Sequence, residues 1–210
     1  MTDMPPTPAR SAHLNLTDGP ELRLWLGDKF RQSLEILFYA RTLSFSTGTP
    51  PEYEDDAKEF LKSHLLRFPK LTHLTIHGGP ISLGQFGTPF EFAFTLQVLD
   101  LRYCTMSFRG LVAFLNQFPF LAKLILNGTT GVADEVNGEP EPKLSFYLKN
   151  LSISNTDLGG EVIDKFSKLK LRCRELSLDI TQNQTAAQKF IHVSRQSLKS
   201  LDLMNTVGCM

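Results

Sequence analysis

A leucine pattern recurs along the chain at a nearly constant interval. The segment LQVLDL at 96–101 has the form LxxLxL, with apolar residues at the first, fourth and sixth positions. The central leucines of this and the related copies are at 14, 43, 74, 99, 124, 151, 176 and 201. Their successive spacings are 29, 31, 25, 25, 27, 25 and 25 residues. A period in this range predicts a stack of structural repeats.

Each LxL triplet predicts one short strand. Because successive side chains of a strand point to opposite faces, the two apolar residues point into a core and their neighbours point outward. Each repeat buries its leucines only against the repeats beside it, so stability accumulates by stacking.

The segments between the strands predict the return path of each repeat. Amphipathic patterns favour helices, and the Pro69 and Pro119 rings mark where two of them must stop. We expect helices at 52–68, 107–118, 160–169 and 185–195, and one or two helices at 20–38. Gly- and Pro-rich composition predicts irregular returns at 78–94 and 129–143.

These features resemble those of a leucine-rich repeat protein over nearly the whole chain. The resemblance implies an α/β solenoid of about eight repeats, with a curved parallel sheet on the concave face and helices and loops on the convex face. Residues 1–10 are then a short polar lead, and residues 11–210 form the repeat domain, without a C-terminal cap. We therefore expect the chain to be an internal piece of a longer protein or a truncated one.

One copy resembles a narrower class. Residues 96–120, LQVLDLRYCTMSFRGLVAFLNQFPF, look like the cysteine-containing repeat subtype of F-box proteins, which recruit substrates to ubiquitin ligases. The FPxLxxL texture is similar to that of fungal F-box-type repeat proteins. The F-box itself is not present, since the nearest string, SLEIL at 33–37, lacks the preceding LP.

A second repeat position, which we call the second column, supports the alignment of the copies. It lies three residues after the last apolar position of each triplet and holds Gly19, Gly48, Gly79, Cys104, Thr129, Thr156, Thr181 and Thr206. A Cys or Thr side chain at this point can bond backbone left unpaired as the chain leaves the strand. Glycine cannot, so the first three repeats are expected to be less regular.

Composition narrows the function classes. The 210 residues hold 22 Lys and Arg and 22 Asp and Glu, so the formal net charge is zero and the basic excess of a duplex-binding protein is absent. No apolar stretch is long enough for a membrane span, and the first ten residues do not resemble a signal peptide. Three scattered cysteines fit a reduced compartment, which predicts a cytoplasmic or nuclear location. From the charge balance and the lack of a long apolar stretch, we expect neither nucleic-acid nor membrane partners.

Catalytic and metal chemistry find little support. The motifs of common hydrolases, kinases and dinucleotide enzymes do not occur, so we expect neither catalytic residues nor a cofactor. His73 and His77 both face outward, but about 3.3 Å per strand residue places them about 13 Å apart, too far for one metal ion. Cys104 and Cys173 occupy repeat positions and are interpreted as structural thiols.

The outward strand positions carry the candidate binding surface. Its largest polar side chains gather at the centre of the expected concave face, in a patch of His73, Thr75, His77, Asp100, Arg102, Tyr103, Lys123 and Asn127. Tyr and Arg are favoured in binding hot spots, so this patch predicts a non-enzymatic protein-binding module. The family resemblance implies substrate recognition for a ubiquitin ligase, whose adaptor would bind only through an F-box outside this chain. The alternative is a structural or regulatory scaffold of the immune-receptor or GTPase-regulator type.

Overall fold

The protein is described by a computed structural model. The structure describes residues 13–16, 38–46, 65–78, 91–132, 143–144, 147–154, 159–179 and 184–204.

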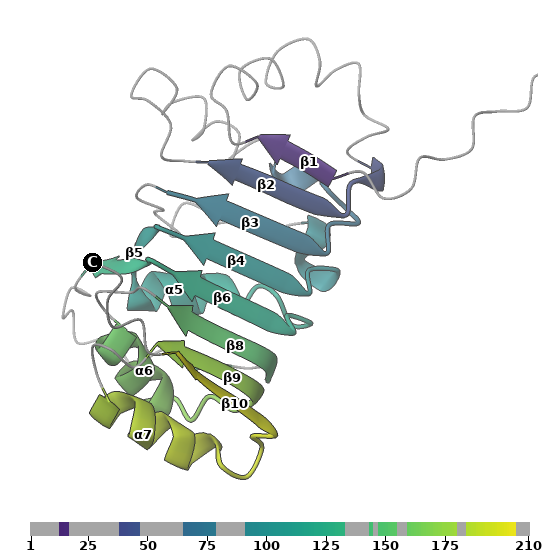
Figure 1. Ribbon diagram of the computed structural model, residues 1–210. Helices are drawn as coiled ribbons and strands as arrows, with labels where there is room; N and C mark the ends of the chain where they lie inside the picture. The colour runs from purple at the N-terminus through teal and green to yellow at the C-terminus, as the bar shows by residue number, and fades with distance from the viewer. Residues whose placement is uncertain are drawn as a thin grey trace, which may run out of the picture.

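Within these ranges, eight strands form one open parallel sheet (Figure 1). In spatial order they are β1 (His13–Leu16), β2 (Thr42–Ser46), β3 (His73–His77), β4 (Val98–Arg102), β6 (Lys123–Asn127), β8 (Leu148–Ser154), β9 (Cys173–Asp179) and β10 (Ser200–Met204). Spatial order follows chain order, which is consistent with a solenoid-like arrangement.

The register confirms the leucine pattern. The central leucines pair across every strand boundary, from Leu14 against Leu43 through to Leu176 against Leu201. Inward leucines from Leu43 to Leu178 are buried in one continuous core. Phenylalanines fill the space behind the sheet, where the Phe92 and Phe118 rings stack with centroids 5.8 Å apart.

Three of the expected helices are present with small shifts in their ends. They are α5 (Phe108–Leu115), α6 (Gly159–Lys168) and α7 (Gln184–Ser194). Ser107 caps α5, since its side chain accepts a hydrogen bond from the Gly110 amide at 3.0 Å. These helices lie on one face of the sheet (Figure 1). We call the opposite face, formed by the outward side chains of the strands, the open face.

Short elements complete the described part of the chain. The strands β5 (Thr105–Ser107) and β7 (Thr130–Val132) form a separate two-stranded parallel sheet, and both were missed in the sequence. Single 3-10 turns occur at η4 (Leu65–Arg67) and η6 (Glu91–Phe94). Most of the helices expected at 20–38 and 52–68 and of the irregular returns at 78–94 and 129–143 lie outside the described residues. No helix in the described ranges is long and apolar enough to cross a membrane.

Candidate functional site

The centre of the open face holds an ion pair that folds back along its own strand. Asp100 and Arg102 on β4 point to the same face because they are two residues apart. The guanidinium donates from Nε to both carboxylate oxygens at 3.1 and 3.0 Å and from Nη2 to Oδ2 at 2.7 Å. Asp100 is only 5% exposed, whereas 43% of the Arg102 side chain remains accessible. Arg102 therefore covers the carboxylate and presents the positive side of the pair to solvent.

Three sequence-predicted residues meet in one row at the strand ends. His77, Arg102 and Asn127 are register partners on β3, β4 and β6. Partial burial lowers the pKa of His77 below its ordinary value of 6.5, and the Arg102 charge lowers it further against the opposing effect of Asp100. The imidazole is therefore held mainly neutral near pH 7 beside a fixed guanidinium.

A second row lies at the strand starts. It contains His73 and Lys123, with Val98 of β4 between them in the register. The Thr72 hydroxyl donates to the Arg41 carbonyl at 3.0 Å and lies 2.9 Å from His73 Nδ1. Thr75 occupies the middle of β3 beside Asp100. The predicted patch thus divides into two rows, with Asp100 and Thr75 between them.

Tyr103 marks the exit from β4. It adopts a φ of 55°, and the residue is 61% exposed. The ring crosses Gly128, where an added Cβ would lie 2.4 Å from Tyr103 Cδ1. Gly128 also has a φ of 62°, so glycine is required there for two separate reasons. The Tyr103 side chain is therefore exposed, and its position is fixed by packing against Gly128.

The residues of the second column act as expected where they are described. The Cys104 thiol donates to the carbonyls of Ile76 and Arg102, and the Thr129 hydroxyl donates to the Leu101 carbonyl at 3.2 Å. Burial raises the pKa of Cys104 to about 12 and that of Cys173 to about 11. Neither buried thiol is therefore ionised near neutral pH, which fits a structural role. The remaining column positions and Cys209 lie outside the described residues.

A hollow of about 250 Å³ on the open face was missed in the sequence. Its lining residues come from β6, β8, β9 and β10 and are Lys123, Asn150, Leu151, Ser152, Glu175, Leu176, Ser177, Ser200 and Asp202. Asn150 donates to Glu175 on its rim, and the Ser177 hydroxyl donates to Asp202 at 3.3 Å. The sequence does contain one indication of this hollow, which is side-chain size. Small serines occupy the middle outward position of two adjacent strands, β8 and β9, between larger neighbours.

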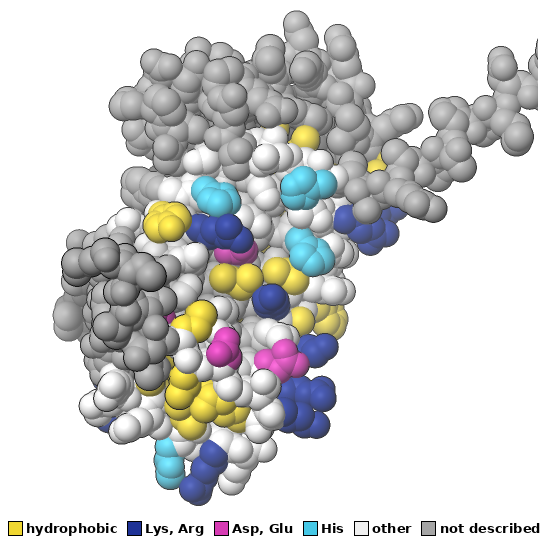
Figure 2. Space-filling model, in the orientation of Figure 1, with side chains coloured by type: hydrophobic (Ala, Val, Ile, Leu, Met, Phe, Trp, Pro, Cys, Tyr) yellow, Lys and Arg dark blue, Asp and Glu magenta, His cyan; other side chains and the backbone are white. Residues whose placement is uncertain are grey.

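Charge is divided across the open face. The basic side chains His73, His77, Arg102 and Lys123 lie on β3 to β6, whereas Glu175, Asp179 and Asp202 lie on β9 and β10. Arg102 is paired with Asp100 on the same strand, so Lys123 supplies the positive charge beside the hollow. Figure 2 shows cyan and dark-blue groups on the upper half of the face, with one magenta group beneath a dark-blue one, and two more magenta groups lower down. The hollow lies between Lys123 on one side and Glu175 and Asp202 on the other.

The described residues contain no group of three or more His, Cys, Asp or Glu that could hold a metal ion. No protein-family model matches the chain, and a search of curated proteins found no match.

Proposed function

We propose that the protein is a non-enzymatic protein-interaction module that captures a partner protein on the open face of its sheet. The observation that carries this proposal is the eight-stranded face, free of described helices, with a hollow that lies between basic side chains on β3 to β6 and acidic side chains on β9 and β10. A divided charge pattern favours one orientation of a partner and rejects others, so it supplies specificity more than raw affinity.

The chemistry of the face supports binding rather than catalysis. Asp100 and Arg102 are already engaged in an ion pair with each other, so the carboxylate is not available as a catalytic acid or base. The mainly neutral His77 lies beside the Arg102 guanidinium, and the buried thiols are protonated. Arg102, Tyr103 and Lys123 instead offer accessible donors and an aromatic ring, which are typical of binding hot spots.

The family and cellular role are finer proposals. We infer a leucine-rich repeat protein from the 25-residue period, the inward leucines and the column bonds of Cys104 and Thr129. Within that family we propose substrate recognition for a ubiquitin ligase in the cytoplasm or nucleus, through an F-box outside these 210 residues. The scaffold role remains the alternative. Binding of the full-length gene product to a cullin-ligase adaptor supports the first role, and its absence supports the second.

Affinity capture with matched charge reversals tests the binding proposal. The baits are the wild-type chain, Lys123→Glu on the open face and Lys189→Glu on α7. Lys189 is a fair control because its side chain is exposed, and Asp164 keeps a second partner, Lys168 at 3.0 Å, when Lys189 changes. We expect the partner recovered by wild type to persist with Lys189→Glu and to fall about tenfold with Lys123→Glu. Equal recovery with all three baits, or loss with the α7 variant alone, would contradict the proposal.

A further inference from the structure

Exposed aromatic side chains gather where the strands begin. In the described part of the chain, five of the eight exposed large hydrophobic residues are Phe38, Tyr39, Phe94, Phe120 and Tyr147. Each precedes the central leucine of its repeat by four or five residues. Since the central leucines are in register, the five aromatics lie along one edge of the sheet, which we call the entry edge.

The entry edge is also strongly cationic. The described segments that lead into the strands contain nine Lys or Arg and no Asp or Glu, and they are 38–41, 67–72, 94–97, 119–122, 147–149, 170–174 and 195–199. The whole chain has no net charge, so this segregation does not follow from composition. It places one sign of charge along a single edge.

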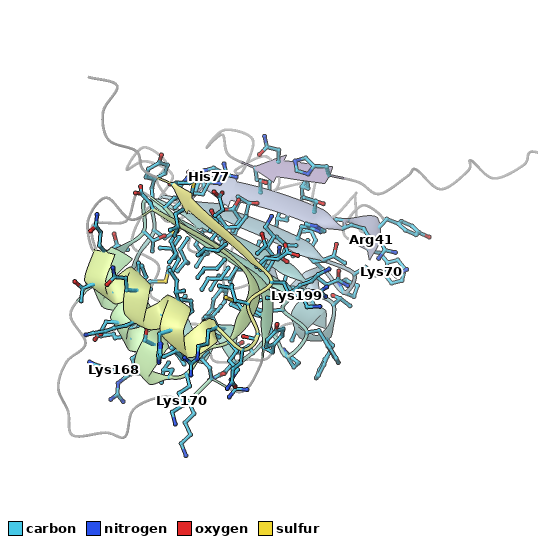
Figure 3. All side chains as sticks on the ribbon, turned by 60° about the horizontal axis from the view of Figure 1, so that its bottom comes forward. Arg41, Lys70, His77, Lys168, Lys170 and Lys199 are labelled. Carbon is cyan, nitrogen blue, oxygen red and sulfur yellow. The ribbon has the colours of Figure 1, made fainter. Side chains whose placement is uncertain are left out.

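The backbone fixes several of these cations in one ladder. Arg41 and Thr72, Thr72 and Gln97, Gln97 and Ala122, and Ala122 and Lys149 are joined by amide-to-carbonyl bonds of 2.8–2.9 Å. The pairing of β8 with β9 places Arg174 beside Lys149, and the Lys199 amide donates to the Arg174 carbonyl. Figure 3 shows Arg41, Lys70 and Lys199 on the side of the sheet where the strands begin.

These cations are available to a partner. Arg41, Lys149, Arg172, Arg174 and Lys199 are exposed, and none of them forms a salt bridge with another residue that the structure describes. Lys70 lies over the Phe38 ring at 4.0 Å and over the Tyr39 ring at 5.4 Å. A cation therefore packs on the Phe38 and Tyr39 pair, and Figure 2 shows dark-blue groups above and below a yellow group along the right-hand edge.

The ring geometry distinguishes the kind of ligand. Single-stranded nucleic acid binds by stacking successive bases on accessible ring faces. Here the Phe94 and Phe120 rings are inclined by 57°, Phe38 and Tyr39 by 89°, and the Phe38 face is covered by Lys70. Inclined rings leave wedge-shaped gaps that suit aliphatic or aromatic side chains, while the surrounding cations suit carboxylates.

We propose that the entry edge is a second interaction surface, separate from the open face, that binds an acidic protein segment containing apolar side chains. Neighbouring strands are about 4.8 Å apart, so the edge from β2 to β10 spans about 29 Å. An extended segment of about nine residues covers that length. Carboxylates of the segment pair with the cation ladder, and its apolar residues contact Phe94 and Phe120, which are 71% and 62% exposed.

Fluorescence anisotropy with synthetic probes on the full chain tests this surface. The probe is a fluorescein-labelled 12-residue peptide in which Asp and Glu alternate with Leu and Phe. Two comparison probes are the same peptide with Ser in place of Leu and Phe, and a labelled 12-nucleotide oligothymidine. We expect the acidic apolar peptide to bind at least about tenfold more tightly than either comparison probe at 0.15 M salt.

Variants locate the binding. Arg174→Glu and Phe120→Ser, made singly, should each weaken peptide binding about five- to tenfold, whereas the α7 variant Lys189→Glu should leave it unchanged. Because Arg174 and Phe120 are exposed, circular dichroism should show folded variants. Equal binding of the Ser peptide, tighter binding of oligothymidine, or insensitivity to both entry-edge variants would overturn the proposal without affecting the open face.

Discussion

Asp100 shows how strongly one neighbour changes the environment of a residue. Its outward position predicts a solvated carboxylate, but Arg102 covers it and the side chain is nearly buried. The alternation of the strand could place both residues on the same face. It could not reveal that the longer side chain would fold over the shorter one, because that depends on rotamers and on the neighbouring Thr75 and Ile125.

Removing Arg102 should therefore cost more than losing an exposed ion pair. Arg102→Ala leaves a buried carboxylate without its guanidinium, and we expect a loss of about 1–2 kcal/mol in the free energy of unfolding. The expected loss is smaller than that for a fully buried ion pair, because Arg102 is itself partly solvated. Urea denaturation measures it, and adding Asp100→Asn to Arg102→Ala should restore part of the loss. An unchanged loss in the double variant would show that the pair does not account for it.

His77 gives the open face a pH dependence with a definite sign. Its pKa is lower in the folded protein than in the unfolded chain, so the unfolded state binds more protons as the pH falls through that interval. Its contribution to stability is therefore complete above the unfolded pKa of about 6.5 and is lost as the pH decreases toward the folded value. Urea midpoints measured from pH 7.5 to 5 should fall less steeply for His77→Gln than for wild type. Parallel pH profiles would contradict this assignment.

At the scale of elements, strands were easier to predict than the segments between them. The LxL triplet places two leucines in the core and leaves little choice of register, so all eight strands and the pairing of their central leucines were predicted. The strand β5 was missed because only Met106 is buried in its three residues, and Ser107 also caps the following helix. Such a short element is defined by its partner β7 rather than by its own pattern.

The end of α6 offers a test of helix termination. Lys170 follows the helix with a φ of 55°, while its amide donates to the Ser167 carbonyl and the Leu171 amide to the Phe166 carbonyl. This left-handed position normally favours glycine. Lys170→Gly should stabilise the protein by about 0.5–1 kcal/mol, and thermal unfolding should show a higher Tm. Lys168→Gly, at the last residue of the same helix, is the comparison variant, and it should lower the Tm because glycine disfavours the helix and the ion pair with Asp164 is lost. A lower Tm for Lys170→Gly would contradict the strain argument.

At the scale of the molecule, burial depends on position in the stack. Leu178 on β9 is fully buried, whereas its register partner Leu203 on β10 is 44% exposed. Leu178→Ala should cost about 2–4 kcal/mol and Leu203→Ala about 1 kcal/mol, because only the first creates a cavity between two neighbouring strands. Urea denaturation of the two variants compares them directly. Equal losses would mean that stability does not accumulate by stacking.

The sequence predicts only part of the molecule's binding surfaces. Outward positions identified the central patch, because strand alternation alone assigns them to a face. The hollow required the relative sizes of side chains on neighbouring strands, and the entry edge required residues before each strand that do not follow the alternating pattern. Phe94 and Phe120 lie outside the alternating strand positions, and both are exposed.

Hydrogen exchange on the purified complex with the captured partner tests the binding proposal most directly. We expect partner binding to slow exchange in β3 (His73–His77), β4 (Val98–Arg102) and β6 (Lys123–Asn127) and around the hollow, while α6 and α7 exchange as in the free chain. Protection confined to α6 and α7, with unchanged exchange in the strands, would contradict capture on the open face.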